Sequence, residues 1–212
     1  NAGSVHNRRG TTIRFKPDPE IFGTLTFQPA RLYRLCRSKA YLFRGVEIRW
    51  VCAASLLRDK DETPAEAVLH FPGGLRDSLE ADIGQSPRVL PIPWAGEANL
   101  PPASNGEATG RVEWAVAWLE EGEGFLHSYC NTVPTPQGGT HEAGFRAALV
   151  KGLRAWGEHR GNRRAAQVTA EDLMAPLAAK LSVFIREPQF QGQTKEKLTT
   201  PEATRLVETA LR

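Results

Sequence analysis

Two pairs of alternating segments, each pair separated by turn-forming residues, constrain the fold of this chain most. In each segment apolar and polar residues alternate with the period of two that is typical of a half-buried β-strand. The segments are Val46–Cys52, Ala65–Phe71, Arg111–Leu119 and Phe125–Val133. Asp59-Lys60-Asp61 lies between the first two, and Glu121-Gly122-Glu123-Gly124 between the last two. We therefore expect two hairpins that contribute strands to a sheet.

Helical periodicity predicts a helix that begins at Pro29 and runs to about Phe43. Its expected buried side carries Leu32, Leu35, Cys36, Ala40 and Phe43. Arg31, Arg34 and Arg37 fall on the opposite side. Lys39 falls inside the apolar sector, where it either extends towards solvent or meets an anionic partner.

Further helices and strands are expected along the rest of the chain. A short helix with Leu75, Leu79 and Ile83 on its buried side should follow Gly73-Gly74, and Leu181–Arg186 should form a strand. A longer helix with Thr140 as its N-cap should run to about Trp156, and its buried side carries Phe145, Leu149, Leu153 and Trp156. Thr169–Asp172 resembles a capping box, and Thr200-Pro201-Glu202 should cap a final helix.

Two segments should lie outside this regular pattern. Residues 95–110 are small, polar and rich in helix and strand breakers, which predicts an exposed loop. Thr11–Phe15 is typical of a strand, but it stops at Pro17-Asp18-Pro19 and has no partner nearby in the sequence. That strand must complete another sheet or pair at long range.

Strands and helices mix without strict alternation, which indicates an α/β (α+β) fold with one mixed sheet. The 212 residues are enough to bury a core, and no run of eighteen apolar residues predicts a membrane helix. Cys36, Cys52 and Cys130 show no disulfide or zinc pattern, which favours a reducing cytoplasm.

Charge is distributed unevenly along the chain. Residues 1–50 carry a net charge of +7, residues 51–140 carry −8 and residues 141–212 carry +4. Two basic ends around an acidic middle would suit an anionic partner such as DNA or a nucleotide phosphate. Ordinary solvated surface charge explains the same distribution, so charge alone leaves both interpretations open.

Familiar catalytic motifs are missing from the sequence. His141-Glu142 begins like a zinc-protease helix, but Phe145 stands where the second histidine is needed. Glu121 and Glu123 lie on a turn, where solvation suits them better than acid catalysis. The five histidines lack metal-ligand spacing, and no phosphate-binding glycine motif occurs. We therefore expect neither catalytic residues nor a metal site in this stretch.

One polar segment, Glu187–Lys197, joins an expected strand to an expected helix. A lysine on such a loop can place a compact positive charge against a terminal phosphate, and a glutamine can hydrogen-bond the same oxygens. Loops of this composition are also common without any function. Phosphate binding and a plain solvated loop both remain open from these residues alone.

Five segments resemble the B subunit of bacterial DNA topoisomerase IV. They are Phe27–Tyr33, Arg37–Phe43, Gly45–Trp50, Tyr129–Arg146 and Pro188–Leu198. The Gly-Gly-Thr-His and Gln-Thr-Lys motifs are shared with the B subunit of gyrase, whereas Arg-Ser-Lys-Ala-Tyr-Leu-Phe favours topoisomerase IV. The resemblance covers nearly the whole chain apart from residues 95–110. Pro176 departs from the family pattern where glycine is expected, which predicts a shortened or kinked helix.

The resemblance implies three parts. Residues 1–24 would be the C-terminal tail of a GHKL-type ATP-binding domain and would supply its last strand. Residues 25–198 would form a transducer domain with the fold of ribosomal protein S5 domain 2. Residues 199–212 would form a helix leading towards the DNA-gate region.

The resemblance also implies ATP-dependent passage of double-stranded DNA, which decatenates and relaxes it. Gln193 and Lys195 would reach the γ-phosphate of ATP bound in the neighbouring domain, and Thr11 would lie near the adenine pocket. Arg146 would contact transported DNA, although helix packing or an ion pair accounts for this residue equally well. Magnesium ligands and catalytic residues would lie outside these residues, so the chain alone should hydrolyse nothing.

The partners implied are the A subunit of topoisomerase IV and a second B subunit, in the bacterial cytoplasm and without a membrane. One alternative is the B subunit of gyrase, an enzyme that introduces negative supercoils. Another is a free-standing basic module that binds nucleic acid through Arg31, Arg34 and Arg37. A small-molecule kinase sharing the S5-like fold would need a phosphate loop, which the sequence lacks.

Overall fold

The computed structural model describes residues 10–23, 25–58, 62–103 and 106–211. Its helices are α1 (Pro19–Phe22), α2 (Pro29–Leu42), α3 (Leu75–Ile83), α4 (Thr140–His159), α5 (Ala170–Met174) and α6 (Glu202–Ala210). Its strands are β1 (Glu47–Val51), β2 (Glu66–His70), β3 (Trp94–Asn99), β4 (Gly110–Trp118), β5 (Phe125–Cys130), β6 (Val133–Pro134) and β7 (Leu177–Ile185). Short 3₁₀ helices lie at η1 (Ala54–Leu56) and η3 (Arg163–Gln167).

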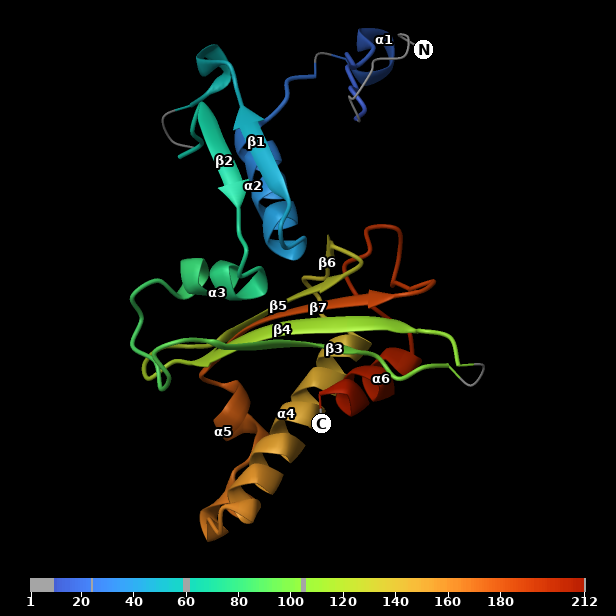
Figure 1. Cartoon of the computed structure of the whole chain (residues 1–212). Coiled ribbons are helices and arrows are strands. Elements are labelled where there is room, and N and C mark those ends of the chain that lie inside the picture. The colour runs from blue at the N-terminus through green and yellow to red at the C-terminus, as the bar shows by residue number, and fades with distance from the viewer. Residues whose placement is uncertain (1–9, 24, 59–61, 104–105, 212) are drawn as a thin grey trace.

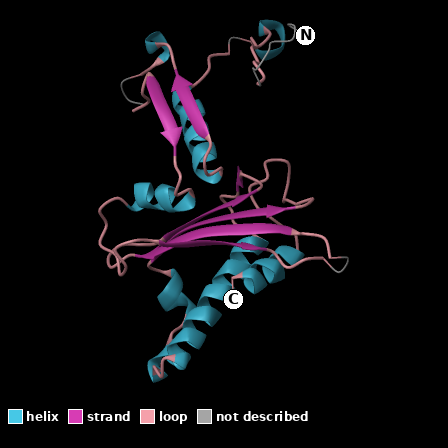
Figure 2. Cartoon of the chain, viewed as in Figure 1, coloured by secondary structure: helices cyan, strands magenta, loops and turns pink. Residues whose placement is uncertain are grey.

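A five-stranded sheet with the strand order β3-β4-β7-β5-β6 occupies the middle of the molecule (Figure 1). Helix α3 lies on one face of this sheet, and α4, α5 and α6 lie on the other. The antiparallel pair β1-β2 packs on α2 and projects beyond α3 (Figure 2). The predicted α/β fold with a mixed sheet and the first predicted hairpin are confirmed. The turn expected at residues 59–61 lies outside the described residues.

Strand β7 lies between the two strands that were expected to form the second hairpin. It pairs antiparallel with β4 from Leu177↔Trp118 to Ile185↔Gly110, and parallel with β5 on its other edge. Eight of its nine residues are buried, because its sequence is almost continuously apolar and suits a strand covered on both faces. The prediction that β4 and β5 pair directly is therefore wrong.

The sheet buries a different set of side chains on each face. On the face of α4 and α6, Leu181 and Val183 of β7 pack with Phe145 and Leu149. On the face of α3, small residues such as Ala117 and Ala178 let Leu79 approach closely. The predicted buried positions of α3, namely Leu75, Leu79 and Ile83, are confirmed.

A charged cluster fastens α3 to this second face. The buried Lys180 ammonium of β7 donates to the Asp82 carboxylate of α3 at 2.5 Å and lies 2.9 Å from His127 Nδ1 of β5. Hydrogen bonding by His127, followed by Lys180, lowers the pKa of Asp82 to about 2. The carboxylate is therefore ionised at neutral pH and compensates the buried ammonium.

The segment 95–110 is not the continuous loop that its composition predicts. Trp94–Asn99 form the edge strand β3, which pairs antiparallel with β4. A Cβ atom on Gly96 would lie 2.6 Å from Cζ2 of Trp114, so a small residue is needed where the indole crosses the strand. Small residues at 95–99 suggest a loop when composition alone is considered. They also suit an edge strand, because they leave room for the Trp114 ring.

The N-terminal segment forms no strand within the described residues. Thr11–Phe15 is irregular and exposed, with 81% of Ile13 and 71% of Phe15 accessible. The predicted last strand of an ATP-binding domain is therefore absent here, because no strand among the described elements lies beside it to share hydrogen bonds. A one-turn helix, α1, follows and is capped by the Asp18 side chain, which accepts from Glu20 N.

The expected buried faces of two helices also need correction. In α2, Ala40 is buried but Leu32 and Leu35 are exposed, because Tyr33 instead packs edge-on against Trp50 of β1. In α4, Phe145 and Leu149 are buried, whereas Trp156 is 61% exposed where the helix extends past the sheet.

The predicted helix caps differ in outcome. The capping box of Thr169 and Asp172 is confirmed at the start of α5, which ends after five residues just before Pro176. Gly139, and not Thr140, occupies the N-cap position of α4. Thr200 does not cap α6, because its hydroxyl accepts a hydrogen bond from Gln189 N instead.

A chain of hydrogen-bonded polar side chains, buried except for the half-buried Glu142, lies under the first turn of α4. Ser128 Oγ donates to Glu142 Oε1 at 2.7 Å and lies 2.7 Å from Thr135 Oγ1, which is 3.1 Å from His141 Nε2. His141 is fully buried, and burial lowers the pKa of its imidazole to about 4. The ring is therefore neutral at physiological pH and acts as a hydrogen-bonding core residue.

We expect two of the three glycines of α4, Gly144 and Gly152, to respond oppositely to alanine. A Cβ atom on Gly144 would lie 2.3 Å from the Thr204 carbonyl oxygen of α6, so Gly144→Ala should lower the free energy of unfolding by about 1–3 kcal/mol. Gly152 faces open space, so Gly152→Ala should raise it by about 0.5–1 kcal/mol. Urea unfolding measures both changes, and equal shifts would contradict the close α4–α6 contact.

We also expect stability to fall in mild acid because of His141. Below pH 6.5 the unfolded chain binds a proton at this residue, whereas the folded protein does not until about pH 4. The free energy of unfolding should therefore drop by about 3 kcal/mol from this group as the pH falls through that window. Urea unfolding between pH 7 and 4 should show a weaker pH dependence for His141→Gln, but not for the exposed-site control His159→Gln. An unchanged slope for His141→Gln would refute this assignment.

Candidate functional site

The loop between β7 and α6, residues 186–201, is closed at its base by its own backbone. Gln191 N donates to Lys197 O at 2.9 Å, and Thr199 N donates to Gln189 O at 2.8 Å. Phe190 and Leu198 form an antiparallel bridge between these bonds. The base therefore behaves like a short hairpin, and the tip at residues 192–196 projects from it.

A second set of hydrogen bonds joins this loop to the segment that precedes α4. Leu198 N donates to Gly138 O at 3.0 Å, and Thr140 N donates to Leu198 O at 3.1 Å. Leu198 itself is fully buried. A Cβ atom on Gly139 would lie 2.2 Å from Leu198 O, so glycine is needed for the two backbones to approach. The glycine pair and the loop therefore form one packed unit at the N-terminus of α4.

The tip exposes the two side chains that the sequence singles out, Gln193 and Lys195. Lys195 has a left-handed backbone, with φ of 57°, and its ammonium lies 5.8 Å from the centroid of the Phe190 ring. Within the described ranges no carboxylate forms an ion pair with Lys195. The arrangement offers an amide and an uncompensated ammonium, which are suitable groups for binding phosphate oxygens.

Thr11 is not brought to this loop. It is exposed on the irregular N-terminal segment, which lies with α1 apart from the sheet (Figure 1). Its expected place near an adenine pocket stays a prediction.

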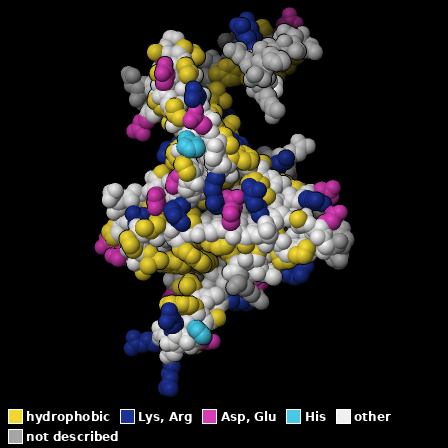
Figure 3. Space-filling view, in the orientation of Figure 1, with side chains coloured by type: hydrophobic (Ala, Val, Ile, Leu, Met, Phe, Trp, Pro, Cys, Tyr) yellow, Lys and Arg dark blue, Asp and Glu magenta, His cyan; other side chains and the backbone are white. Residues whose placement is uncertain are grey.

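Arg146 lies exposed on α4, and its guanidinium is 3.7 Å from the Glu142 carboxylate one turn earlier. The Arg146 side chain is exposed while Glu142 is largely covered, and ion pairs one turn apart on a helix are worth only about 0.3–0.5 kcal/mol, so this pair does not prevent Arg146 from meeting another anion. Further along, Arg160, Arg163 and Arg164 are exposed at the far end of α4 and on η3, where Lys and Arg side chains gather (Figure 3). Contact of Arg146 with DNA stays a prediction beside the ion pair.

Lys39 makes a contact with a residue far away in the sequence. Its ammonium donates to both the carbonyl and the hydroxyl oxygen of Thr132, each at 2.7 Å, and burial lowers its pKa. Thr132 follows β5 in a left-handed turn, with φ of 66°. Lys39 thus does not extend freely into solvent, and it fastens α2 to the turn after β5. Its contact with an anionic partner stays a prediction. The two residues are 93 positions apart, so helical periodicity gives no signal for this pairing.

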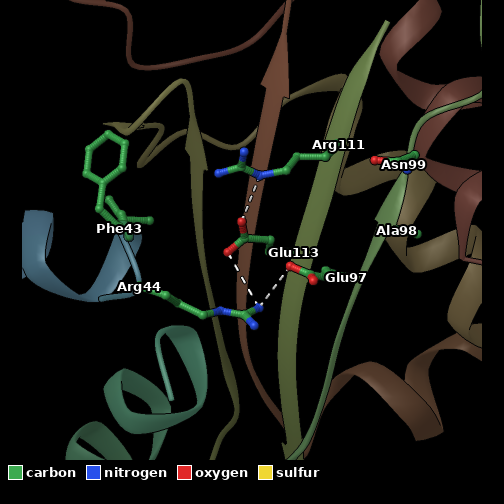
Figure 4. Close-up of a pocket in the computed structure, with 8 residues that line it drawn as sticks. Phe43, Arg44, Glu97, Ala98, Asn99, Arg111 and Glu113 are labelled. Carbon is green, nitrogen blue, oxygen red and sulfur yellow. Dashed lines mark hydrogen bonds and ion pairs between the residues drawn. The ribbon is translucent and has the colours of Figure 1, made fainter. Parts of the chain in front are cut away.

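A cavity of about 580 Å³ lies between the end of α2 and strands β3 and β4 (Figure 4). The buried Glu113 carboxylate accepts from Arg111 Nε at 2.9 Å and lies 3.8 Å from an Arg44 nitrogen, which is also 3.4 Å from Glu97. Two guanidinium groups and two carboxylates line it, so their formal charges cancel. The cavity therefore lacks the excess positive charge that a phosphate group would need, and its ion pairs connect α2 with β4.

The described residues hold neither a clustered set of metal ligands nor a helix suited to a bilayer. No group of three or more His, Cys, Asp or Glu side chains there is placed to hold a metal ion. None of the helices in that part of the chain is both long and apolar enough to cross a membrane.

Comparison with curated proteins finds close relatives. The chain is 55% identical over 210 residues to the B subunit of DNA topoisomerase 4 from Caulobacter vibrioides, covering 97% of this chain and 29% of that protein. It is 46% identical over 211 residues to the B subunit of DNA topoisomerase 4 from Bartonella bacilliformis, covering 99% of this chain and 30% of that protein. The chain therefore spans about 30% of the length of these relatives.

Comparison with solved structures agrees with these relatives. The 43K ATPase domain of Thermus thermophilus gyrase B, solved in complex with an aminocoumarin, matches with a TM-score of 0.76 and 28% identity. The match covers 93% of this chain and 50% of that one. Residues 75–212 match the DNA gyrase B family, and this range includes α4, β7, the loop and α6. This chain belongs to the DNA gyrase B family.

Proposed function

We propose that this chain is the transducer part of the ATP-hydrolysing B subunit of a type II DNA topoisomerase, topoisomerase IV in particular. In the whole enzyme it would couple ATP binding and hydrolysis to DNA strand passage, decatenation and relaxation. The observation that carries this proposal is the exposed tip with Gln193 and Lys195, on a loop whose base is bonded to the start of α4. The close relatives named as topoisomerase 4 B subunits support the same conclusion.

At the proposed site, the Lys195 ammonium and the Gln193 amide donate hydrogen bonds to γ-phosphate oxygens of ATP held in the neighbouring domain. ATP supplies the phosphate whose presence or loss the loop detects, and its magnesium ions are held by residues outside this chain. Loss of the two contacts frees the tip, and the bonds of Leu198 to Gly138 and Thr140 carry that change into α4. Two phosphate contacts thereby bias one of two domain arrangements.

The proposed division of the chain follows from this role. Residues 1–24 belong to the ATP-binding domain, and the exposed Ile13 and Phe15 side chains suit a segment that another domain covers. Residues 25–198 form the transducer domain, with a topology like that of ribosomal protein S5 domain 2. Residues 199–212, which include α6, lead towards the DNA gate. Alone, the chain would not hydrolyse ATP.

The proposed partners are the A subunit of the enzyme, a second B subunit that dimerises when ATP binds, and double-stranded DNA in the bacterial cytoplasm. Arg146 would meet the phosphate backbone of transported DNA, so this contact would be independent of sequence and weaken with salt. The alternative within the family is gyrase. A supercoiling assay that includes the A subunit distinguishes the two, since gyrase introduces negative supercoils and topoisomerase IV does not.

We expect Lys195→Ala to lower DNA-stimulated ATP turnover by tenfold or more, or about 1.4 kcal/mol of barrier, because one phosphate contact is lost. The measurement uses the full-length B subunit in complex with the A subunit. Lys197→Ala is the matched control, because it removes the same charge from the same loop and Lys197 is also exposed. Unchanged turnover in folded Lys195→Ala, or an equal loss in Lys197→Ala, would refute the phosphate contact.

A further inference from the structure

One residue outside the loop, Gln137, is hydrogen-bonded to Glu196, the residue that follows Lys195. Gln137 N donates to the Glu196 carbonyl oxygen at 3.0 Å. Its side-chain Nε2 donates to Glu196 Oε2 at 2.8 Å. In the part of the chain that the structure describes, no other side-chain hydrogen bond links residues 190–197 to the rest of the protein. Gln137 is therefore the attachment point of the tip.

This attachment fixes the backbone from which Lys195 projects. A non-glycine residue with φ of 57° keeps that conformation only where its surroundings hold it. The two bonds of Gln137 fix both the carbonyl group and the side chain of Glu196, the next residue along. They therefore set the direction in which the Lys195 side chain leaves the loop.

The side-chain bond from Gln137 also determines where the negative charge of Glu196 lies. Glu196 is adjacent to Lys195, and a carboxylate close to a phosphate group would repel it. The Gln137 amide binds the Glu196 carboxylate and directs it towards the segment before α4. The ammonium of Lys195 is then the nearest formal charge that the tip offers to an anion.

Gln137 also lies at the start of the path into α4. Gly138 O and Thr140 N, one and three residues later, both bond to the buried Leu198. A Cβ atom on Gly139, between them, would lie 2.2 Å from the backbone of Leu198. This close approach of the two backbones leaves the segment 137–140 little freedom to move separately from the loop.

We propose that Gln137 is a positioning residue for the phosphate contact of Lys195, acting through its paired hydrogen bonds to Glu196. This inference rests on the proposed function. It predicts that Gln137 affects recognition of a nucleoside triphosphate and leaves recognition of a diphosphate unchanged, because only the triphosphate carries the γ-phosphate that Lys195 would contact.

The test measures binding of the non-hydrolysable β,γ-imido analogue of ATP, and of ADP, to the full-length B subunit in the presence of DNA and the A subunit. Gln137→Ala should weaken analogue binding by about three- to tenfold and change ADP binding by less than about twofold. Lys195→Ala shows how much analogue binding is lost when the phosphate contact itself is removed. Adding Gln137→Ala to Lys195→Ala should weaken analogue binding little further, because both changes act on the same contact. Gln191→Ala, an exposed glutamine of the same loop, should bind both nucleotides like the wild type.

An exchange of the two side chains separates positioning from general damage. Gln137→Glu places two carboxylates together and should weaken analogue binding at least as much as Gln137→Ala. Adding Glu196→Gln to it restores an amide–carboxylate bond with the roles reversed, and analogue binding should recover to within about twofold of wild type. Thermal unfolding checks that each variant is folded.

The outcomes distinguish this inference from the proposed function. If Lys195→Ala binds the analogue and ADP with the wild-type ratio, the phosphate contact fails and this inference fails with it. If Lys195→Ala loses the analogue selectively but Gln137→Ala does not, the positioning role alone is overturned. Equal weakening of both nucleotides by Gln137→Ala, or no recovery in the exchanged pair, overturns it as well.

Discussion

Strand β7 is hydrogen-bonded along both edges, antiparallel to β4 and parallel to β5, and it is buried on both faces. It cannot shift without breaking one of these two ladders. The loop that carries Lys195 leaves from its end, and α6 returns the chain against α4. The rigidity of one central strand therefore fixes where the loop begins, while the buried Leu198 attaches its second half to the segment before α4.

Polar contacts between distant segments connect the other parts of the molecule to this sheet. Lys39 binds Thr132, Arg44 lies between Glu97 and Glu113, and Lys180 binds Asp82. Lys39 and Asp82 belong to helices and Arg44 to the turn after α2, and each contact reaches a strand or the turn after one. Arg44 and Lys180 are paired with carboxylates, whereas Lys39 is satisfied by the neutral oxygens of Thr132. A buried ion pair such as that of Lys180 adds little stability compared with apolar residues of the same shape, but it is costly to break on one side only.

Much of the fold could be predicted from local patterns, because α3, the β1-β2 hairpin, the capping box of Thr169 and the polar character of the loop depend on neighbouring residues. The same holds for the exposed positions of Gln193 and Lys195. Pairings at long range could not be predicted. Nothing near Leu177–Ile185 indicates that this strand separates β4 from β5, and nothing near Lys39 points to Thr132. The edge strand β3 was missed because its small residues fit against Trp114, a contact that composition does not reveal.

The place of β7 in the strand order also has a consequence for synthesis of the chain. The central strand ends about 55 residues after β5 ends, so both of its neighbours leave the ribosome before it exists. At roughly 5–20 residues per second, the interval lasts about 3–11 s. During this time the edge of β4 that β7 will occupy has no partner strand. Its apolar side chains Val112 and Val116, which are buried in the finished fold, also lack their complete core. A nascent chain with this topology is exposed to mispairing until its last strand arrives, which favours slow folding and a need for chaperones.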